Sequence, residues 1–171
     1  MADFNKAIPI TLQWEGGYVN NPNDPGGETN RGIILSVWKK NAHLCGCVGT
    51  SDELKKITED QAKVIYKAIF WNGILGDEII RQDIANQVFD TYVNCGSAAI
   101  VMLQHVLNKH AAGLVADGIF GQKTLDALNS CEFEIAHEYK AARIAYYQWL
   151  PTVNPKLSIF LAGWLRRANA F

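Results

Sequence analysis

The chain has 171 residues, of which 49% are hydrophobic and 19% are charged, and its formal net charge is −1. This composition is typical of one compact globular domain, alone or with a small packed subdomain, and it excludes a disordered chain. The near-neutral charge provides no basic face for nucleic acid, and no apolar run approaches the roughly 20 residues that span a bilayer.

The four cysteines do not form a recognisable framework. Cys45 and Cys47 are separated by one residue, which is too close for a relaxed disulfide framework, and no CxxC pair occurs. We therefore expect four reduced thiols, no cofactor and no metal. The alternative is a metal cluster of His43, Cys45 and Cys47, although no second ligand pair stands at a recognisable spacing.

Apolar spacing predicts a mostly helical first half. The first helix is expected over about residues 4–15, with Phe4, Ile8 and Leu12 on one face, and Pro9 requires that it begins near residue 6–8 or kinks. A polar loop over 16–32 follows, then a short helix near 35–42 and a second loop over 43–53.

The second half is predicted to be helical as well. Thr58 and Gln61 form a capping box that begins an amphipathic helix. Further helices are expected over 82–93, 97–107, 122–129, 131–149 and 156–168, with a tight turn at Asp117-Gly118. The sequence therefore predicts an all-α fold.

The opening loop carries the residues best suited to chemistry. Glu15 ends the first helix and is followed by two glycines, which allow a ligand to approach the backbone closely. Trp14 and Tyr18 flank it and can exclude water, which favours the protonated form of a carboxyl group. A protonated carboxyl can donate a proton to the leaving oxygen of a glycoside, so Glu15 is a candidate general acid.

Two further loop residues complete the candidate catalytic set. Asp24 can serve as the second carboxylate, which activates water or stabilises positive charge on the sugar, and Thr29 can orient that water. Each has a structural alternative: Glu15 as an ordinary helix-end residue, Asp24 as a turn former in Asn-Asp-Pro-Gly, and Thr29 as a capping hydroxyl.

Candidate substrate-binding residues extend beyond the loop. Tyr18 and Trp71 are candidates for contact with sugar, and Trp71 is expected to be partly exposed because a polar Asn-Gly loop follows it. Asp90 and Asn94 lie four apart on one helix face. They either form the floor of a sugar cleft, or hydrogen-bond to each other and to the loop above.

Several strings resemble a known family. Glu15-Gly-Gly-Tyr18, Asn23–Asn30, Phe70-Trp71-Asn72 and Val88–Asn94 are similar to glycoside hydrolase family 108, the N-acetylmuramidases found mainly as phage or prophage endolysins, some of them labelled secretion activators. Asp117–Gly121, Arg143, Tyr146-Tyr147 and Gly163–Arg166 resemble the predicted peptidoglycan-binding domain that accompanies it.

The resemblance implies a lysozyme-like helical fold with a small helical C-terminal subdomain. It places a catalytic region at 1–94 and a peptidoglycan-binding region at 95–171, which can also pack as one unit. It implies cleavage of the β-1,4 bond between N-acetylmuramic acid and N-acetylglucosamine, with Glu15 as the catalytic glutamate. Phage-type lysozymes show a Glu-x8-Asp-x5-Thr pattern; Asp24 keeps the first spacing, whereas Thr29 arrives one residue early.

Two other functions remain open, and a protein that acts on the cell wall must also be transported to it. A lytic transglycosylase also uses a single glutamate, and a non-catalytic wall-binding or secretion-activator protein would bind peptidoglycan through 95–171 without cutting it. The N-terminus lacks the charged region and apolar core of a signal peptide. We therefore expect synthesis in the cytoplasm, no membrane insertion, and action at the cell wall or periplasm after release by a holin or export system.

Overall fold

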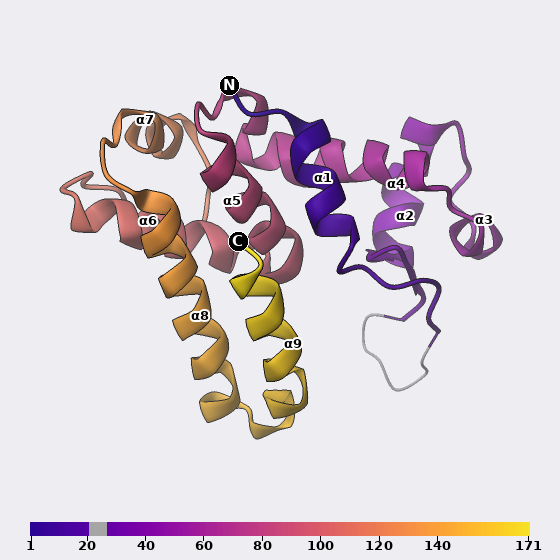
Figure 1. The fold of residues 1–171 in the computed structure, drawn as a ribbon. Helices are drawn as coiled ribbons and strands as arrows, with labels where there is room; N and C mark the ends of the chain where they lie inside the picture. Colours follow the sequence, from indigo (N-terminus) through magenta and orange to yellow (C-terminus); the bar gives the residue numbers. More distant parts are fainter. Residues whose placement is uncertain (21–26) are drawn as a thin grey trace.

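The computed structural model describes residues 1–20 and 27–171, and helices dominate this part of the chain (Figure 1). The α-helices are α1 (Phe4–Leu12), α2 (Leu35–Asn41), α3 (Ser51–Lys55), α4 (Glu59–Tyr66), α5 (Gln82–Cys95), α6 (Ser97–Lys109), α7 (Gln122–Ser130), α8 (Ile135–Val153) and α9 (Ser158–Asn169). Two-residue strands β1 (Thr29–Asn30) and β2 (Ile33–Ile34) form an antiparallel pair. The all-α, lysozyme-like prediction is confirmed.

Helix α1 ends just before the opening motif. Asp3 caps it by accepting a hydrogen bond from the Asn5 N–H at 2.8 Å, and Pro9 lies inside the helix. The helix therefore begins at residue 4 rather than near 6–8. It ends at Leu12, three residues earlier than expected, and a turn carries Glu15, whose N–H donates to the Leu12 carbonyl oxygen at 3.1 Å.

The hairpin β1–β2 was not predicted. Its two central residues, Arg31 and Gly32, both have positive φ, of 49° and 74°, which is the geometry of a two-residue type I′ turn. The Arg31 N–H donates to the Gly16 carbonyl oxygen at 3.1 Å, so the tip of the hairpin is fixed against the residues that follow Glu15. Strands of two residues are too short to show the alternating pattern of a strand.

The capping box predicted from the sequence is present at the start of α4. The Thr58–Gln61 capping box is present, with the Gln61 N–H donating to Thr58 Oγ1 at 3.2 Å and the Thr58 N–H donating to Gln61 Oε1 at 2.9 Å. After α4 the chain continues as a π turn over Lys67–Trp71.

One hydrophobic core connects both halves of the chain. It runs from Ala2 and Phe4 through the buried faces of α4, α5 and α6 to Tyr139 on α8. The domain boundary expected near residue 94 falls at the turn between α5 and α6, and helices on both sides of it contribute to this core.

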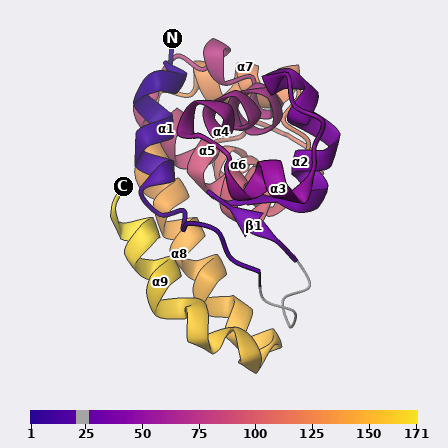
Figure 2. The ribbon, with the colours of Figure 1, turned by 90° about the vertical axis from the view of Figure 1, so that its right-hand side faces the viewer.

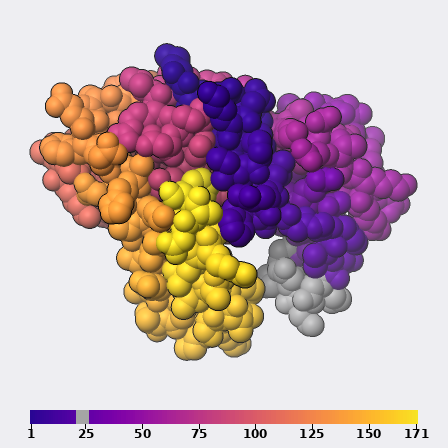
Figure 3. All heavy atoms as spheres, in the orientation of Figure 1, coloured from indigo at the N-terminus to yellow at the C-terminus, as the bar shows by residue number. Residues whose placement is uncertain are grey.

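The last two helices bring the C-terminus back to the N-terminal half. Helices α8 and α9 form an antiparallel pair that extends away from the other helices, and the end of α9 returns beside α1 and α5 (Figures 1 and 2). Figure 3 shows α9 in yellow lying against the indigo N-terminal segment. No helix in residues 1–20 and 27–171 combines the length and hydropathy needed to span a bilayer.

Candidate functional site

Glu15 lies in a surface groove of about 450 Å³. The groove is lined by residues from the turn after α1, from the hairpin and from the end of α3 and the segment that follows it: Glu15, Gly16, Gly17, Tyr18, Asn30, Arg31, Lys55, Lys56 and Ile57. Its walls therefore offer one carboxylate, three cationic side chains, a phenol and backbone groups. A groove of this size and polarity suits a hydrophilic ligand with negative charge.

One oxygen of Glu15 is held by an arginine from the far end of the chain. Arg167 Nη1 of α9 lies 2.9 Å from Glu15 Oε1, and the two side chains are only 8% and 16% exposed. Burial alone lowers the pKa of Arg167, but hydrogen bonds and negative charge from Asp90, together with Glu15, outweigh burial and raise the pKa. Arg167 is therefore a permanent cation beside Glu15.

The other oxygen of Glu15 faces the hairpin turn and a tyrosine. A Cβ added at Gly32 would overlap the Tyr66 hydroxyl and the Glu15 carboxylate, so only glycine fits between them. The Tyr66 hydroxyl donates to the Arg31 carbonyl oxygen at 2.9 Å. Burial, and next the charge of Glu15, raise the pKa of Tyr66, so the phenol stays neutral. Glu15 is thus confined on two sides.

The contact between Glu15 and Arg167 is part of a buried network of ion pairs. Asp90 on α5 is fully buried and binds Arg167, whose Nε and Nη2 donate to its carboxylate at 2.8–3.1 Å. Arg143 on α8 donates from Nη2 to Asp90 Oδ2 at 2.6 Å. With Glu15, the network contains two positive and two negative charges, which is the balance that buried ions require.

The cleft-floor role for Asp90 and Asn94 is wrong. Asp90 is inaccessible because two arginines enclose its carboxylate. Asn94 is exposed, and its Oδ1 accepts a hydrogen bond from the Tyr147 hydroxyl at 2.7 Å. Neither residue lines the groove that contains Glu15. The alternative of a bond between the two side chains is not what the structure shows either, because each is bound to α8.

The expected exposure of Trp71 is also wrong. Its ring is 0% exposed, packs edge-on against Phe4 and Phe89 at centroid distances of 5.7 and 5.5 Å, and donates from Nε1 to Asp77 at 2.7 Å. The ring lies in the interior at the end of the π turn, where Gly76 lies against it. Sugar therefore cannot stack on Trp71 in this conformation.

The loop candidates have different positions. Tyr18 lines the groove beside Glu15, and its exposed hydroxyl donates to Glu28 Oε1 at 2.5 Å. Thr29 lies in β1 outside the groove lining, and its Oγ1 donates to the Gly27 carbonyl oxygen at 3.4 Å. Asp24 lies outside the residues that the structure describes.

Sequence reasoning missed Arg167, Lys55 and Lys56 as parts of this region. A lysine pair after a short helix is usually a solvated surface, and an arginine near the end of a helix usually interacts with the last carbonyl groups. The third cation of the groove, Arg31, has its Nη1 4.0 Å from Glu59 Oε2 of α4.

The described residues contain no group of three metal-binding side chains. All four cysteines are unpaired and partly buried. Cys45 Sγ lies 3.6 Å from the Gln61 carbonyl oxygen, and burial raises the pKa of the Cys45 thiol. This environment favours a neutral thiol over a metal-binding thiolate.

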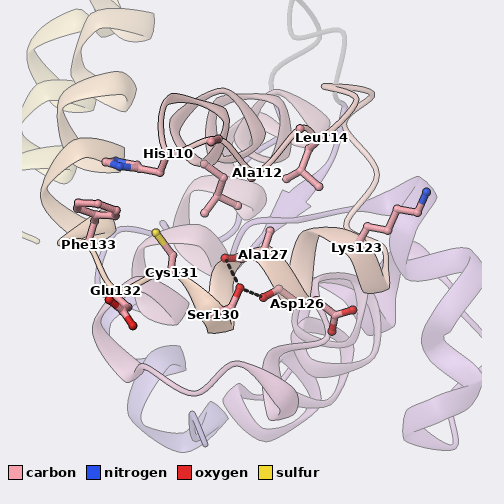
Figure 4. A pocket seen from close by; sticks show the side chains of 13 residues that line it. His110, Ala112, Leu114, Lys123, Asp126, Ala127, Ser130, Cys131, Glu132 and Phe133 are labelled. Atoms are coloured by element: carbon pink, nitrogen blue, oxygen red, sulfur yellow. Dashed lines mark hydrogen bonds between the residues drawn. The ribbon is translucent and has the colours of Figure 1, made fainter.

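A larger pocket of about 620 Å³ lies away from Glu15, in the C-terminal region (Figure 4). Its apolar wall includes Leu114 and Ala127, and the His110 ring stacks on Phe133 with a centroid distance of 4.2 Å. Lys123 stands at one side of the pocket. Its size suits a ligand, but it contains none of the groups assembled around Glu15.

Two family models match consecutive parts of the chain. The family model described as Glycosyl hydrolase 108 matches residues 8–96, and the model described as Predicted Peptidoglycan domain matches residues 98–169. Among curated proteins, none matches the chain.

A solved structure of SagA from Brucella abortus is similar over almost the whole length. It is 31% identical, covers 98% of this chain and 94% of its own, and superposes with a TM-score of 0.70. The family match covers more than half of the 171 residues and includes Glu15 and its groove. The chain belongs to the glycosyl hydrolase 108 family.

Proposed function

We propose that this protein is a muramidase, which hydrolyses the β-1,4 bond between N-acetylmuramic acid and N-acetylglucosamine in peptidoglycan. Glu15 is the general acid in this proposal. The observation that carries it is the confinement of the Glu15 carboxylate between Arg167 and the Gly32 turn at the wall of an open polar groove. A fixed carboxyl that faces substrate is the first requirement of glycoside hydrolysis.

The cationic side chains of the groove favour an anionic polymer as the substrate. Arg31, Lys55 and Lys56 line it, and Lys55 Nζ is 3.0 Å from Asp52 and 4.0 Å from Glu28. N-acetylmuramic acid carries a lactyl group, and the wall peptides attached to it end in carboxylates. Charge-assisted hydrogen bonds from the groove to these groups would favour peptidoglycan over a neutral amino-sugar polymer.

Glu15 must change its protonation state during the reaction. Glu15 in its protonated form transfers its proton to the glycosidic oxygen as the bond from that oxygen to the anomeric carbon breaks, and water adds to that carbon. The proton is regained from water when the product leaves.

The second carboxylate in this proposal is Asp24, with Thr29 in the weaker role of orienting water; both assignments rest on sequence spacing. If Asp24 is the base, a separation of about 6.5–9.5 Å from Glu15 corresponds to inversion and one of about 5 Å to retention. Because the substrate lies in the wall, delivery there by a holin or export system is part of the proposal.

Loss of turbidity of purified peptidoglycan tests the catalytic assignment. Wild type should clear the suspension, whereas Glu15→Gln, which keeps the size and removes the acid, should be inactive. Glu78→Gln is the matched control, because Glu78 is an exposed glutamate outside the groove. Equal clearing by wild type and Glu15→Gln would remove Glu15 from the mechanism.

Mass spectrometry of the released fragments identifies the reaction. A muramidase produces reducing N-acetylmuramic acid ends, whereas a lytic transglycosylase produces 1,6-anhydro ends. If 1,6-anhydro products form and their formation requires Glu15, the catalytic role of Glu15 stands but the reaction is transglycosylation rather than hydrolysis.

The second candidate function is wall binding without cleavage, which the pocket in the C-terminal region favours. This pocket of about 620 Å³ lies within the region matched by the peptidoglycan model. Co-sedimentation with insoluble peptidoglycan tests it: Ala127→Trp should fill the pocket and weaken sedimentation. Binding without any Glu15-dependent cleavage would favour this function over the first.

A further inference from the structure

Arg167 does more than balance charge, because two carboxylates fix the orientation of its guanidinium. Its guanidinium divides its donors between two carboxylates: Nε and Nη2 bind Asp90, whereas Nη1 binds Glu15 at 2.9 Å. A planar fork bound at two atoms on one side has no freedom to rotate. The direction in which Nη1 presents its hydrogen to Glu15 is therefore fixed by Asp90.

Asp90 is fixed in turn by the second arginine. Arg143 binds Asp90 Oδ2 at 2.6 Å, its Nε donates to the Tyr147 hydroxyl at 3.1 Å, and its side chain is 1% exposed. The order Arg143, Asp90, Arg167, Glu15 thus connects α8, α5 and α9 to the turn after α1. Three of these four groups are too buried to contact a polysaccharide.

We propose that Arg167 is a positioning residue for the reaction of Glu15, so that the active site is complete only when α9 supplies it. This inference rests on the proposed glycosidase function. Arg167 belongs to the region matched by the peptidoglycan model, whereas Glu15 belongs to the glycosyl hydrolase region. The C-terminal region is therefore part of the catalytic site and does more than hold the wall.

The position of Arg167 predicts which kinetic constant it controls. Arg167 is not among the residues that line the groove, so its removal leaves the substrate-binding surface in place. Without the guanidinium, Glu15 can rotate away from the glycosidic oxygen, and a displacement of about 1 Å can lower a rate by about 100-fold. The effect should therefore fall on kcat and leave KM unchanged.

The experiment measures kcat and KM on solubilised peptidoglycan glycan strands, by the appearance of reducing ends. The variants are Arg167→Met, Arg167→Lys and the matched control Arg166→Met, which removes an exposed arginine from the neighbouring position. Arg167→Met should lower kcat about 100-fold with KM within about twofold of wild type. The kcat of Arg167→Lys should lie between those of wild type and Arg167→Met, because an ammonium group keeps the charge but lacks the planar fork of a guanidinium. Arg166→Met should match wild type.

Thermal unfolding of each variant separates positioning from loss of the fold. If Arg167→Met does not fold, Arg167→Lys carries the test, because its charge still compensates Asp90; a kcat lowered about tenfold at unchanged KM then supports the inference. A folded Arg167→Met with kcat within threefold of wild type overturns it, as does a loss confined to KM or a folded Arg167→Lys with full kcat. If wild type shows no Glu15-dependent cleavage, the proposed function falls and the inference with it.

Discussion

Replacement of Asp90 by asparagine should strongly destabilise the protein. Asp90 is fully buried and is the carboxylate shared by Arg143 and Arg167. Asparagine keeps the shape but removes the negative charge, and its amide N–H₂ faces guanidinium donors. The network then changes from two positive and two negative charges to an excess positive charge in the interior.

The expected loss follows from the cost of breaking a buried ion pair. Removal of one partner from such a pair costs about 3–5 kcal/mol, because the remaining charge is buried without compensation. Domains are typically stable by about 5–15 kcal/mol, so Asp90→Asn should remove about a fifth of the free energy of unfolding or more. With an m value of about 2–3 kcal/mol/M, a loss of about 4 kcal/mol lowers the urea midpoint by roughly 1.3–2 M.

Urea unfolding followed by tryptophan fluorescence measures this shift. The control is Asp52→Asn, which removes an 85% exposed carboxylate paired only with Lys55 in the described part of the chain. Exposed ion pairs contribute little, so its midpoint should stay near wild type. A shift for Asp90→Asn no larger than that of the control would refute the view that this network holds α5, α8 and α9 together.

Three further predictions follow from the groove and its surroundings. Gly32→Ala should abolish clearing of peptidoglycan, because the new Cβ overlaps the Glu15 carboxylate, whereas Gly27→Ala, with a similar φ of 68° and open space, should retain activity. Lys56→Gln should raise KM at low salt, and the difference should vanish near 1 M salt, where the Debye length is about 3 Å; a salt-independent difference would contradict a charge role. Backbone N–H groups, first that of Thr50, lower the pKa of Glu53. Its stabilising effect is therefore fully present above the unfolded pKa of about 4.3 and is lost as the pH falls through the lower folded value, so Glu53→Gln should flatten the acid limb of a stability–pH curve.

The sequence alone was enough to predict the helices, and it led to the hypothesis that Glu15 is the general acid. Capping and apolar periodicity act within a few residues, which is why the start of the helix at Thr58 and the course of α5 were predictable. Glu15 could be proposed from sequence because the glycines and aromatic residues beside it are its neighbours in the chain. The burial of Trp71 was not predicted because it depends on contacts with Phe4 and Phe89, which are distant from it in the sequence.

The contacts of Glu15, by contrast, could be identified only from the tertiary structure. Arg167 binds it from the last helix, and Asp90, which fixes Arg167, comes from the middle of the chain. A charged residue in a helical pattern indicates a solvated face, since unpaired charges are rarely buried. These charges are buried because they compensate one another, and that compensation exists only after α1, α5, α8 and α9 have packed together.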